Sequence, residues 1–250
     1  MTSFLESMIA RAKADKQTIV LAEGDDPRTL EAAETILAQD VANLIILGDV
    51  EGIKASGRNL EGAQLIDPRT SELAAEFADT FYELRKNKGM TPEKAAETVK
   101  DVLYFGVMMV KTGRADGMVA GACHATGDVL RPSLQILKTA PGVKLVSSFF
   151  IMVVPNCEYG QDGTFLFSDC GLEIQPDAEK LAHIAVNSAK SWKNLIGTDP
   201  VVAMLSHSTY GSAKNDDQAK VAQAAAIARE LAPELALDGE LQADAAMVPS

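Results

Sequence analysis

Basic residues, cysteines and long apolar runs are all scarce in this sequence of 250 residues. Lysine and arginine number 23 against 35 aspartates and glutamates, which gives a net charge of −12. Because nucleic-acid-binding faces and polybasic membrane contacts are basic, we expect neither nucleic acid nor a membrane as a partner. The longest apolar run, 102–110, is much shorter than the ~20 residues that a bilayer span requires.

The three cysteines, Cys123, Cys157 and Cys170, form no CxxC pair. Their odd number and spacing exclude a disulfide framework and a zinc ribbon, and a reducing cytoplasm is the simplest compartment for such a chain. We interpret Cys123 and Cys157 as structural. The first residues also lack the basic segment and apolar core of a signal peptide.

Several nucleotide-binding and catalytic motifs are missing as well. The sequence contains no GxGxxG, GxxxxGK[ST], GxSxG or HExxH, which counts against a Rossmann dinucleotide site, a P-loop, an α/β-hydrolase and a zincin. The three histidines, His124, His183 and His207, lie far apart without the spacing of metal ligands. We therefore predict neither a metal site nor a bound cofactor.

Short apolar runs alternate with helical patterns along the chain. Strands are expected at 18–22, 43–47, 64–67, 116–120, 144–154, 164–169 and 201–205. Helices are expected at 3–14, 27–37, 71–87, 91–113, 127–139, 177–197 and 215–231, with a short helix after Asp49. The repeated β-α order is typical of an α/β protein with a mostly parallel sheet that helices flank.

Two consecutive expected strands, 144–154 and 164–169, interrupt this alternation. The length of the chain allows one large domain or two modest ones. We predict a first α/β lobe at 1–140 and a second at 141–250, each with a mostly parallel sheet.

The segment 205–214 is the strongest local signal for a ligand site. It follows an expected strand and precedes an expected helix, and parallel sheets bind ligands beyond the carboxyl ends of their strands. Hydroxyls, a permissive glycine and the amide groups of a helix start suit a phosphate group. The candidate residues are Ser206, Ser208, Thr209, Gly211 and Ser212. A merely polar loop remains an equally good interpretation.

Two arginines and one cysteine are further candidates. Arg131 lies near the start of an expected helix, where it could hold an anion or form an ion pair with Asp128. Arg85 lies at a helix C-terminus, where cations also complement the helix dipole. Cys170 follows Asp169 at a strand end, and its thiol is either accessible to a ligand or a small buried apolar group.

Four segments, taken in order, resemble the phosphate acetyltransferase family. They are 82–95, 104–121, 128–136 and 206–214, and 25–28 also fits. The resemblance covers essentially the whole chain. Family members transfer an acetyl group reversibly between coenzyme A and inorganic phosphate, forming acetyl phosphate. The resemblance therefore implies acetyl-CoA, phosphate and acetyl phosphate as partners, with coenzyme A as a substrate and not a bound cofactor.

The resemblance also implies a fold and site roles. The fold consists of two α/β lobes with the active-site cleft between them, usually in a homodimer. Arg85 and Arg131 would bind anionic groups of phosphate or coenzyme A. The loop 206–212 would shape the phosphate site, and Cys170 would lie near the cleft without carrying an acyl group.

Family members continue beyond the point that corresponds to residue 250. The further segment includes a Ser-Arg pair and the aspartate proposed to deprotonate coenzyme A, so no catalytic base is assigned here and the second lobe is expected to be incomplete. We expect at most a trace of a full-length relative's activity. Two alternatives stay open. One is a phosphate butyryltransferase, because a methylene changes specificity by only ~1–3 kcal/mol. The other is a non-catalytic module that binds acyl-CoA or acyl phosphate.

Overall fold

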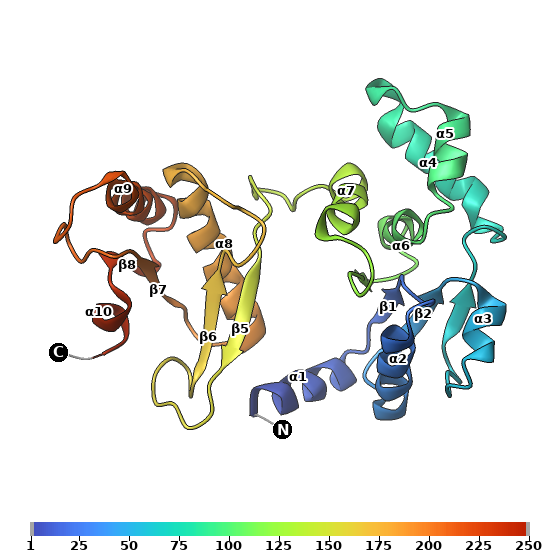
Figure 1. The fold of residues 1–250 in the computed structure, drawn as a ribbon, viewed down its shortest axis with the longest axis horizontal. Coiled ribbons are helices and arrows are strands. Elements are labelled where there is room, and N and C mark those ends of the chain that lie inside the picture. Colours follow the sequence, from blue (N-terminus) through green and yellow to red (C-terminus); the bar gives the residue numbers. More distant parts are fainter. Residues whose placement is uncertain (1–2, 249–250) are drawn as a thin grey trace. The chain divides into compact units, whose positions relative to one another are not determined.

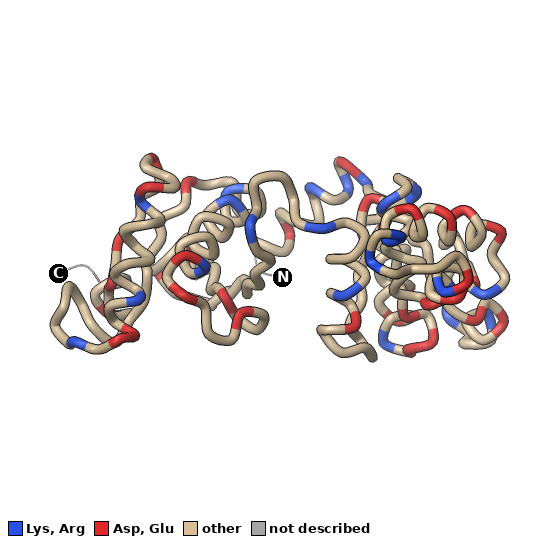
Figure 2. Tube along the Cα trace, turned by 90° about the horizontal axis from the view of Figure 1, so that it is seen from above, with Lys and Arg blue, Asp and Glu red and all other residues tan. Residues whose placement is uncertain are grey.

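A computed structural model describes residues 3–248, and it divides the chain into two compact units (Figure 1). The N-terminal unit comprises Ser7–Lys138, and the C-terminal unit comprises Thr139–Ser250 with Met1–Glu6. Helix α1 (Ser3–Ala14) contributes residues to both. Acidic residues are spread along both units instead of gathering on one segment (Figure 2).

The N-terminal unit is built around a sheet of four parallel strands in the order β3-β2-β1-β4. They are β1 (Thr18–Leu21), β2 (Asn43–Leu47), β3 (Gln64–Ile66) and β4 (Gly117–Val119). The chain adds β2 and β3 on one side of β1 and β4 on the other. This change of direction puts the loops after β1 and β4 at the position where open parallel sheets bind ligands.

Helices lie on both faces of this sheet, and further helices pack on them. The helices of this unit are α2 (Pro27–Gln39), α3 (Val50–Ala55), α4 (Leu73–Arg85), the 3-10 turn Lys86–Lys88, α5 (Pro92–Thr98), α6 (Val102–Lys111) and α7 (Thr126–Ile136). Two neighbouring residues determine where α2 begins. The Asp26 side chain accepts a hydrogen bond from the Arg28 amide at 2.8 Å, and Pro27 occupies the first turn.

The single helix expected at 91–113 is wrong, because the structure has two helices there. Helix α5 ends at Thr98 and α6 begins at Val102. Between them, the Asp101 carboxylate accepts hydrogen bonds from the amides of Leu103 (3.0 Å) and Tyr104 (3.2 Å). An aspartate that binds the backbone in this way starts a new helix instead of continuing the old one.

Alternation along the strands produces two apolar cores, one on each face of the sheet. Ile45 and Leu47 belong to a cluster with Phe77 and Phe105, whereas neighbouring side chains of the same strand belong to a second cluster. Gly106 brings α6 close to the sheet, since a Cβ atom there would lie 2.6 Å from the Met118 sulfur. The continuous apolar strands thus reflect burial on both faces.

The C-terminal unit contains two separate pairs of strands. Strands β5 (Phe149–Val153) and β6 (Thr164–Ser168) are antiparallel, and β7 (Val201–Leu205) and β8 (Ala236–Leu241) are parallel. The α/β class is confirmed, although only the β7-β8 pair is parallel here. The helices of the C-terminal unit are α8 (Ala178–Ile196), α9 (Asp216–Leu231) and α10 (Ala243–Met247).

Large apolar side chains are less buried in the C-terminal unit. Its core cluster consists of Met204, Val221 and three alanines, while Phe150 is 57% and Val201 86% exposed. A groove lined by residues of β6, β7, α8 and α10 runs through this unit. Within residues 3–248, no helix is long and apolar enough to cross a membrane.

Candidate active site

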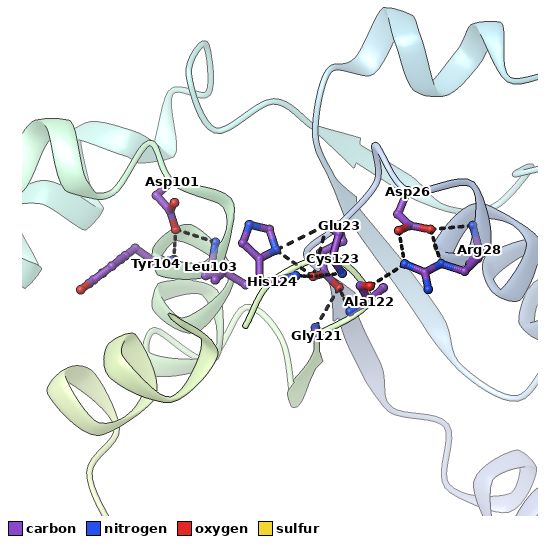
Figure 3. Close-up of polar contacts among 10 residues, drawn as sticks. All are labelled: Glu23, Asp26, Arg28, Asp101, Leu103, Tyr104, Gly121, Ala122, Cys123 and His124. Carbon is purple, nitrogen blue, oxygen red and sulfur yellow. Dashed lines mark hydrogen bonds and ion pairs between the residues drawn. The ribbon is translucent and has the colours of Figure 1, made fainter. Parts of the chain in front are cut away.

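The loops after β1 and β4 meet at a buried glutamate (Figure 3). Glu23 follows β1 and is only 4% exposed. Its carboxylate accepts hydrogen bonds from four consecutive amides after β4: Gly121 (2.8 Å), Ala122 (2.7 Å), Cys123 (3.0 Å) and His124 (3.0 Å). Four converging amides form a concave site for an anion, and here the anion is part of the protein.

Glu23 is ionised at neutral pH despite its burial. Burial raises the pKa of this carboxyl, but hydrogen bonds from the Cys123 amide, the His124 side chain and further amides outweigh it and hold the pKa at about 2. The end of the sheet therefore carries a fixed negative charge.

The side chains of His124 and Cys123 both contact this carboxylate. His124 Nδ1 lies 2.7 Å from Glu23 Oε1, and Cys123 Sγ lies 3.5 Å from the same oxygen. An ionised carboxylate only accepts hydrogen bonds, so Nδ1 carries the imidazole proton. Partial desolvation of the otherwise exposed thiol and the neighbouring Glu23 raise the pKa of Cys123, which keeps it protonated at neutral pH. These three side chains could together hold a metal ion.

Arg28 fastens the two loops to each other. Its guanidinium donates to both oxygens of Asp26, at 3.0 and 2.6 Å, and to the Ala122 carbonyl at 2.5 Å. Hydrogen bonds from Arg28, first from its side chain and second from its amide, hold the pKa of Asp26 at about 2. This charged clamp fixes the loop after β4 against the start of α2.

The two candidate arginines come from α4 and α7 of the N-terminal unit. Arg131 is exposed and lies 3.4 Å from Asp128, so the ion pair expected from the sequence is present. Burial raises the pKa of the Tyr104 phenol, and the charges of Arg131 and Arg85 oppose that increase. Arg85 Nε is buried without a hydrogen-bond partner among the described residues. An unpaired buried guanidinium donor is suited to a bound anion.

The loop 206–214 already holds an internal anion. Ser208 Oγ (3.1 Å), the Gly211 amide (2.6 Å) and Gln218 Nε2 (2.7 Å) all donate to the buried carboxylate of Glu240. The Gly211 amide and the Gln218 side chain are the main causes that lower the pKa of Glu240. The loop thus has the donors that an anion needs, and in this structure Glu240 uses them.

The remaining hydroxyls of this loop stabilise its turns. Ser206 Oγ accepts from the Ser208 amide (3.3 Å), and Ser212 Oγ accepts from the Thr209 amide (3.1 Å). Thr209 Oγ1 accepts from the Gln242 amide at 3.0 Å. Side-chain contacts of this kind fix loop shape, and a role in phosphate binding stays a prediction for all of these residues.

Cys170 lies on a different loop of the C-terminal unit. Its Sγ donates to Ser148 Oγ at 3.4 Å. The adjacent Asp169 accepts from the Ser148 hydroxyl (2.6 Å) and from the amides of Gly171 and Leu172 (both 2.8 Å). Burial raises the pKa of Asp169, but these hydrogen bonds hold it far below its usual range. Cys170 is half-buried beside another ionised carboxylate.

The structure therefore groups the predicted residues by unit. Arg85 and Arg131 lie in the N-terminal unit, and the loop 206–212 surrounds Glu240 in the C-terminal unit. Sequence reasoning missed Glu23, His124 and Glu240. Glu23 had a signal, since it follows a strand at the ligand edge, whereas Glu240 lies in a strand that the sequence did not predict.

A parallel sheet with polar loops at the carboxyl ends of its strands is typical of α/β proteins that bind a ligand at that edge. The family model described as "Phosphate acetyl/butaryl transferase" matches residues 3–250. The chain belongs to this family, and it is a transferase by family.

Two similar proteins are both named phosphate acetyltransferase. The chain is 57% identical to a phosphate acetyltransferase of Acetivibrio thermocellus, covering 99% of this chain and 75% of that protein. It is 56% identical to the phosphate acetyltransferase of Thermoanaerobacterium thermosaccharolyticum, covering 98% of this chain and 76% of that protein.

Two solved structures are also similar. A phosphotransacetylase from Streptococcus pyogenes has a TM-score of 0.91 at 41% identity, covering 100% of this chain and 76% of that one. The EutD phosphotransacetylase from Staphylococcus aureus has a TM-score of 0.88 at 43% identity, covering 98% and 74%. The chain thus spans about three quarters of the length of these relatives.

Proposed function

We propose that this protein transfers an acetyl group reversibly between acetyl-CoA and inorganic phosphate, forming acetyl phosphate and coenzyme A. The observation that carries this proposal is the 57% identity to a phosphate acetyltransferase over 99% of the chain. The site chemistry supports it, because both substrates carry anionic oxygens and Arg85 offers an unpaired buried donor.

In the direction of acetyl phosphate synthesis, a phosphate oxygen attacks the thioester carbonyl and the coenzyme A thiolate leaves. The reverse reaction uses the thiolate as the nucleophile and releases phosphate. The protein must hold two anions together and stabilise the oxyanion that develops on the carbonyl. We assign anion binding to Arg85 and Arg131, and shaping of the phosphate site to the loop 206–212, with Cys170 near the bound substrates.

The acetyl group is the favoured acyl substrate, because the similar proteins are named phosphate acetyltransferases. A phosphate butyryltransferase would use butyryl-CoA with higher kcat/KM than acetyl-CoA. A non-catalytic binding module would bind coenzyme A without turnover. Parallel assays with acetyl-CoA and butyryl-CoA therefore separate all three functions.

The decisive experiment measures thioester formation from acetyl phosphate and coenzyme A by the full-length enzyme that carries Arg131→Ala. Removing a charge-assisted contact worth about 1.5–3 kcal/mol lowers kcat/KM about 10- to 150-fold. The melting temperature should stay unchanged. Arg58→Ala is a matched control, since Arg58 pairs only with surface carboxylates of Glu31 and Glu34 in the same unit. If the kinetics are unchanged but the stability falls, the role of Arg131 is limited to its ion pair with Asp128, and the assignment to anion binding is wrong.

We also propose that the protein acts in the cytoplasm as a homodimer. Three free cysteines in the structure are compatible with a reducing compartment. The dimer rests on the family resemblance, and analytical ultracentrifugation tests it directly. A monomer at micromolar concentration would contradict it.

A further inference from the structure

Three chemically different donor atoms converge where the loops after β1 and β4 meet. They are the Glu23 carboxylate, the Cys123 thiol and the His124 imidazole, whose ligand atoms all lie within 4.8 Å of one another. We propose that these three side chains bind a thiophilic divalent cation of the zinc class. Among the residues 3–248 this is the one group of its kind.

The distances between the donor atoms fit one ion. Cys123 Sγ lies 3.6 Å from His124 Nδ1 and 3.5 Å from Glu23 Oε1. A tetrahedral zinc ion, with bonds of about 2.3 Å to sulfur and about 2.0 Å to nitrogen or oxygen, separates sulfur from either atom by about 3.5 Å. The nitrogen–oxygen pair is 2.7 Å apart and must lengthen by about half an ångström. The partly exposed His124 ring has room for that movement.

The donor set selects the class of cation. Thiolate and imidazole ligands favour zinc and its neighbours, whereas calcium and magnesium require mainly oxygen ligands in larger number. The ion replaces the hydrogens that now lie between these atoms. The Cys123 thiol releases its proton to solvent, and the His124 proton moves from Nδ1 to Nε2. One carboxylate and one thiolate then balance the two positive charges of the ion.

The surroundings hold the ligands in place. Four amides fix the Glu23 carboxylate, and Arg28 binds the carbonyl of Ala122, next to Cys123. Such outer contacts orient metal ligands. The charge of Arg28 is already balanced by Asp26 at 2.6 Å. Cys123 is exposed, so an ion can enter from solvent. Three protein ligands leave a fourth position open for water or another small ligand.

Cobalt(II) titration tests the site without any turnover, so the result is independent of acetyl transfer. Wild-type protein should bind one equivalent of Co²⁺ with a thiolate-to-cobalt absorption band, and Zn²⁺ should displace it. Cys123→Ser and His124→Gln should each weaken Zn²⁺ binding by at least about tenfold in calorimetry. Cys157→Ser, which changes a cysteine outside the site, should bind like the wild type.

Alkylation followed by mass spectrometry supplies a second measurement, which uses the wild-type protein. Zn²⁺ should slow alkylation of Cys123 and leave Cys170 unaffected. Circular dichroism confirms that each variant is folded before its affinity is compared. The proposal is overturned if the cobalt–thiolate band is missing in wild-type protein, or if Cys123→Ser binds Zn²⁺ as tightly as the wild type.

Discussion

The two units of this protein each bury a glutamate at their parallel strands, Glu23 after β1 and Glu240 within β8, but they hold it differently. In the N-terminal unit four backbone amides and one side chain, that of His124, bind Glu23. In the C-terminal unit one amide and two side chains bind Glu240. Among the natural residues only proline removes a backbone amide donor, so the Glu23 site depends mainly on loop geometry, whereas the Glu240 site depends on the particular residues Ser208 and Gln218.

The apolar cores of the two units also differ in the size of the side chains that they bury. Phe77, Phe81 and Phe105 are completely buried in the N-terminal unit, and Phe77 packs edge-on against Phe105 with centroids 4.8 Å apart. The central cluster of the C-terminal unit is made largely of alanines. Since burial energy scales with apolar area, the N-terminal unit should be the more stable of the two.

The largest effect should come from the aromatic core. Phe77→Ala should lower the free energy of unfolding of the N-terminal unit by about 3–5 kcal/mol, because it leaves a cavity against Phe105. Denaturant unfolding with hydrogen exchange on β1 and β2 measures this. Phe150→Ala in the half-exposed β5 should cost about 1 kcal/mol or less. Equal costs would remove the difference between the cores.

Substitution of the buried glutamates should cause the second largest loss of stability. Glu23→Gln loses charge-assisted hydrogen bonds, and we expect a loss of about 1.5–3 kcal/mol in thermal unfolding. Glu240→Gln should lower the melting temperature less, because Ser208 and Gln218 can reorient toward a neutral amide. A larger loss for Glu240→Gln would mean that side-chain donors hold their carboxylate more firmly than amides do.

Acid should weaken the C-terminal unit through Asp169 and Glu240. The pKa of each is below its ordinary value, 3.8 and 4.5, because hydrogen bonds favour the charged form. Their contribution is fully present above those values and is lost as the pH falls through the lower pKa of the folded state. Melting temperatures recorded from neutral pH to pH 3 should fall more steeply in wild-type protein than in the Asp169→Asn, Glu240→Gln double variant.

The smallest effect is expected at the exposed end of β7. Val201 is 86% exposed, so Val201→Ala should change stability by no more than about 0.5 kcal/mol. Val20, completely buried in β1, provides the matched control, and Val20→Ala should cost about 2 kcal/mol. A large loss at Val201 would show that this strand is covered in solution.

The sequence by itself determined the elements whose signals are local. Strands β1 and β2 follow from continuous apolar runs, and α2 follows from Asp26 and Pro27 at its start. These signals act between residues a few positions apart, so they can be recognised without knowing the fold. The motifs around Arg131 and the loop 206–214 likewise indicated the family to which the chain belongs.

Only the tertiary structure decided which residues meet. Glu23 and His124 are 101 positions apart and come together because β1 and β4 are neighbours in the sheet. Strand β8 carries Asp238 and Glu240, so no apolar pattern identifies it, and it forms because β7 provides a partner ladder. Glu240 then occupies the donors of a loop that the sequence predicted as a phosphate site. Pairing of strands is a long-range contact, and its energy depends on the partner strand, which the local sequence does not contain.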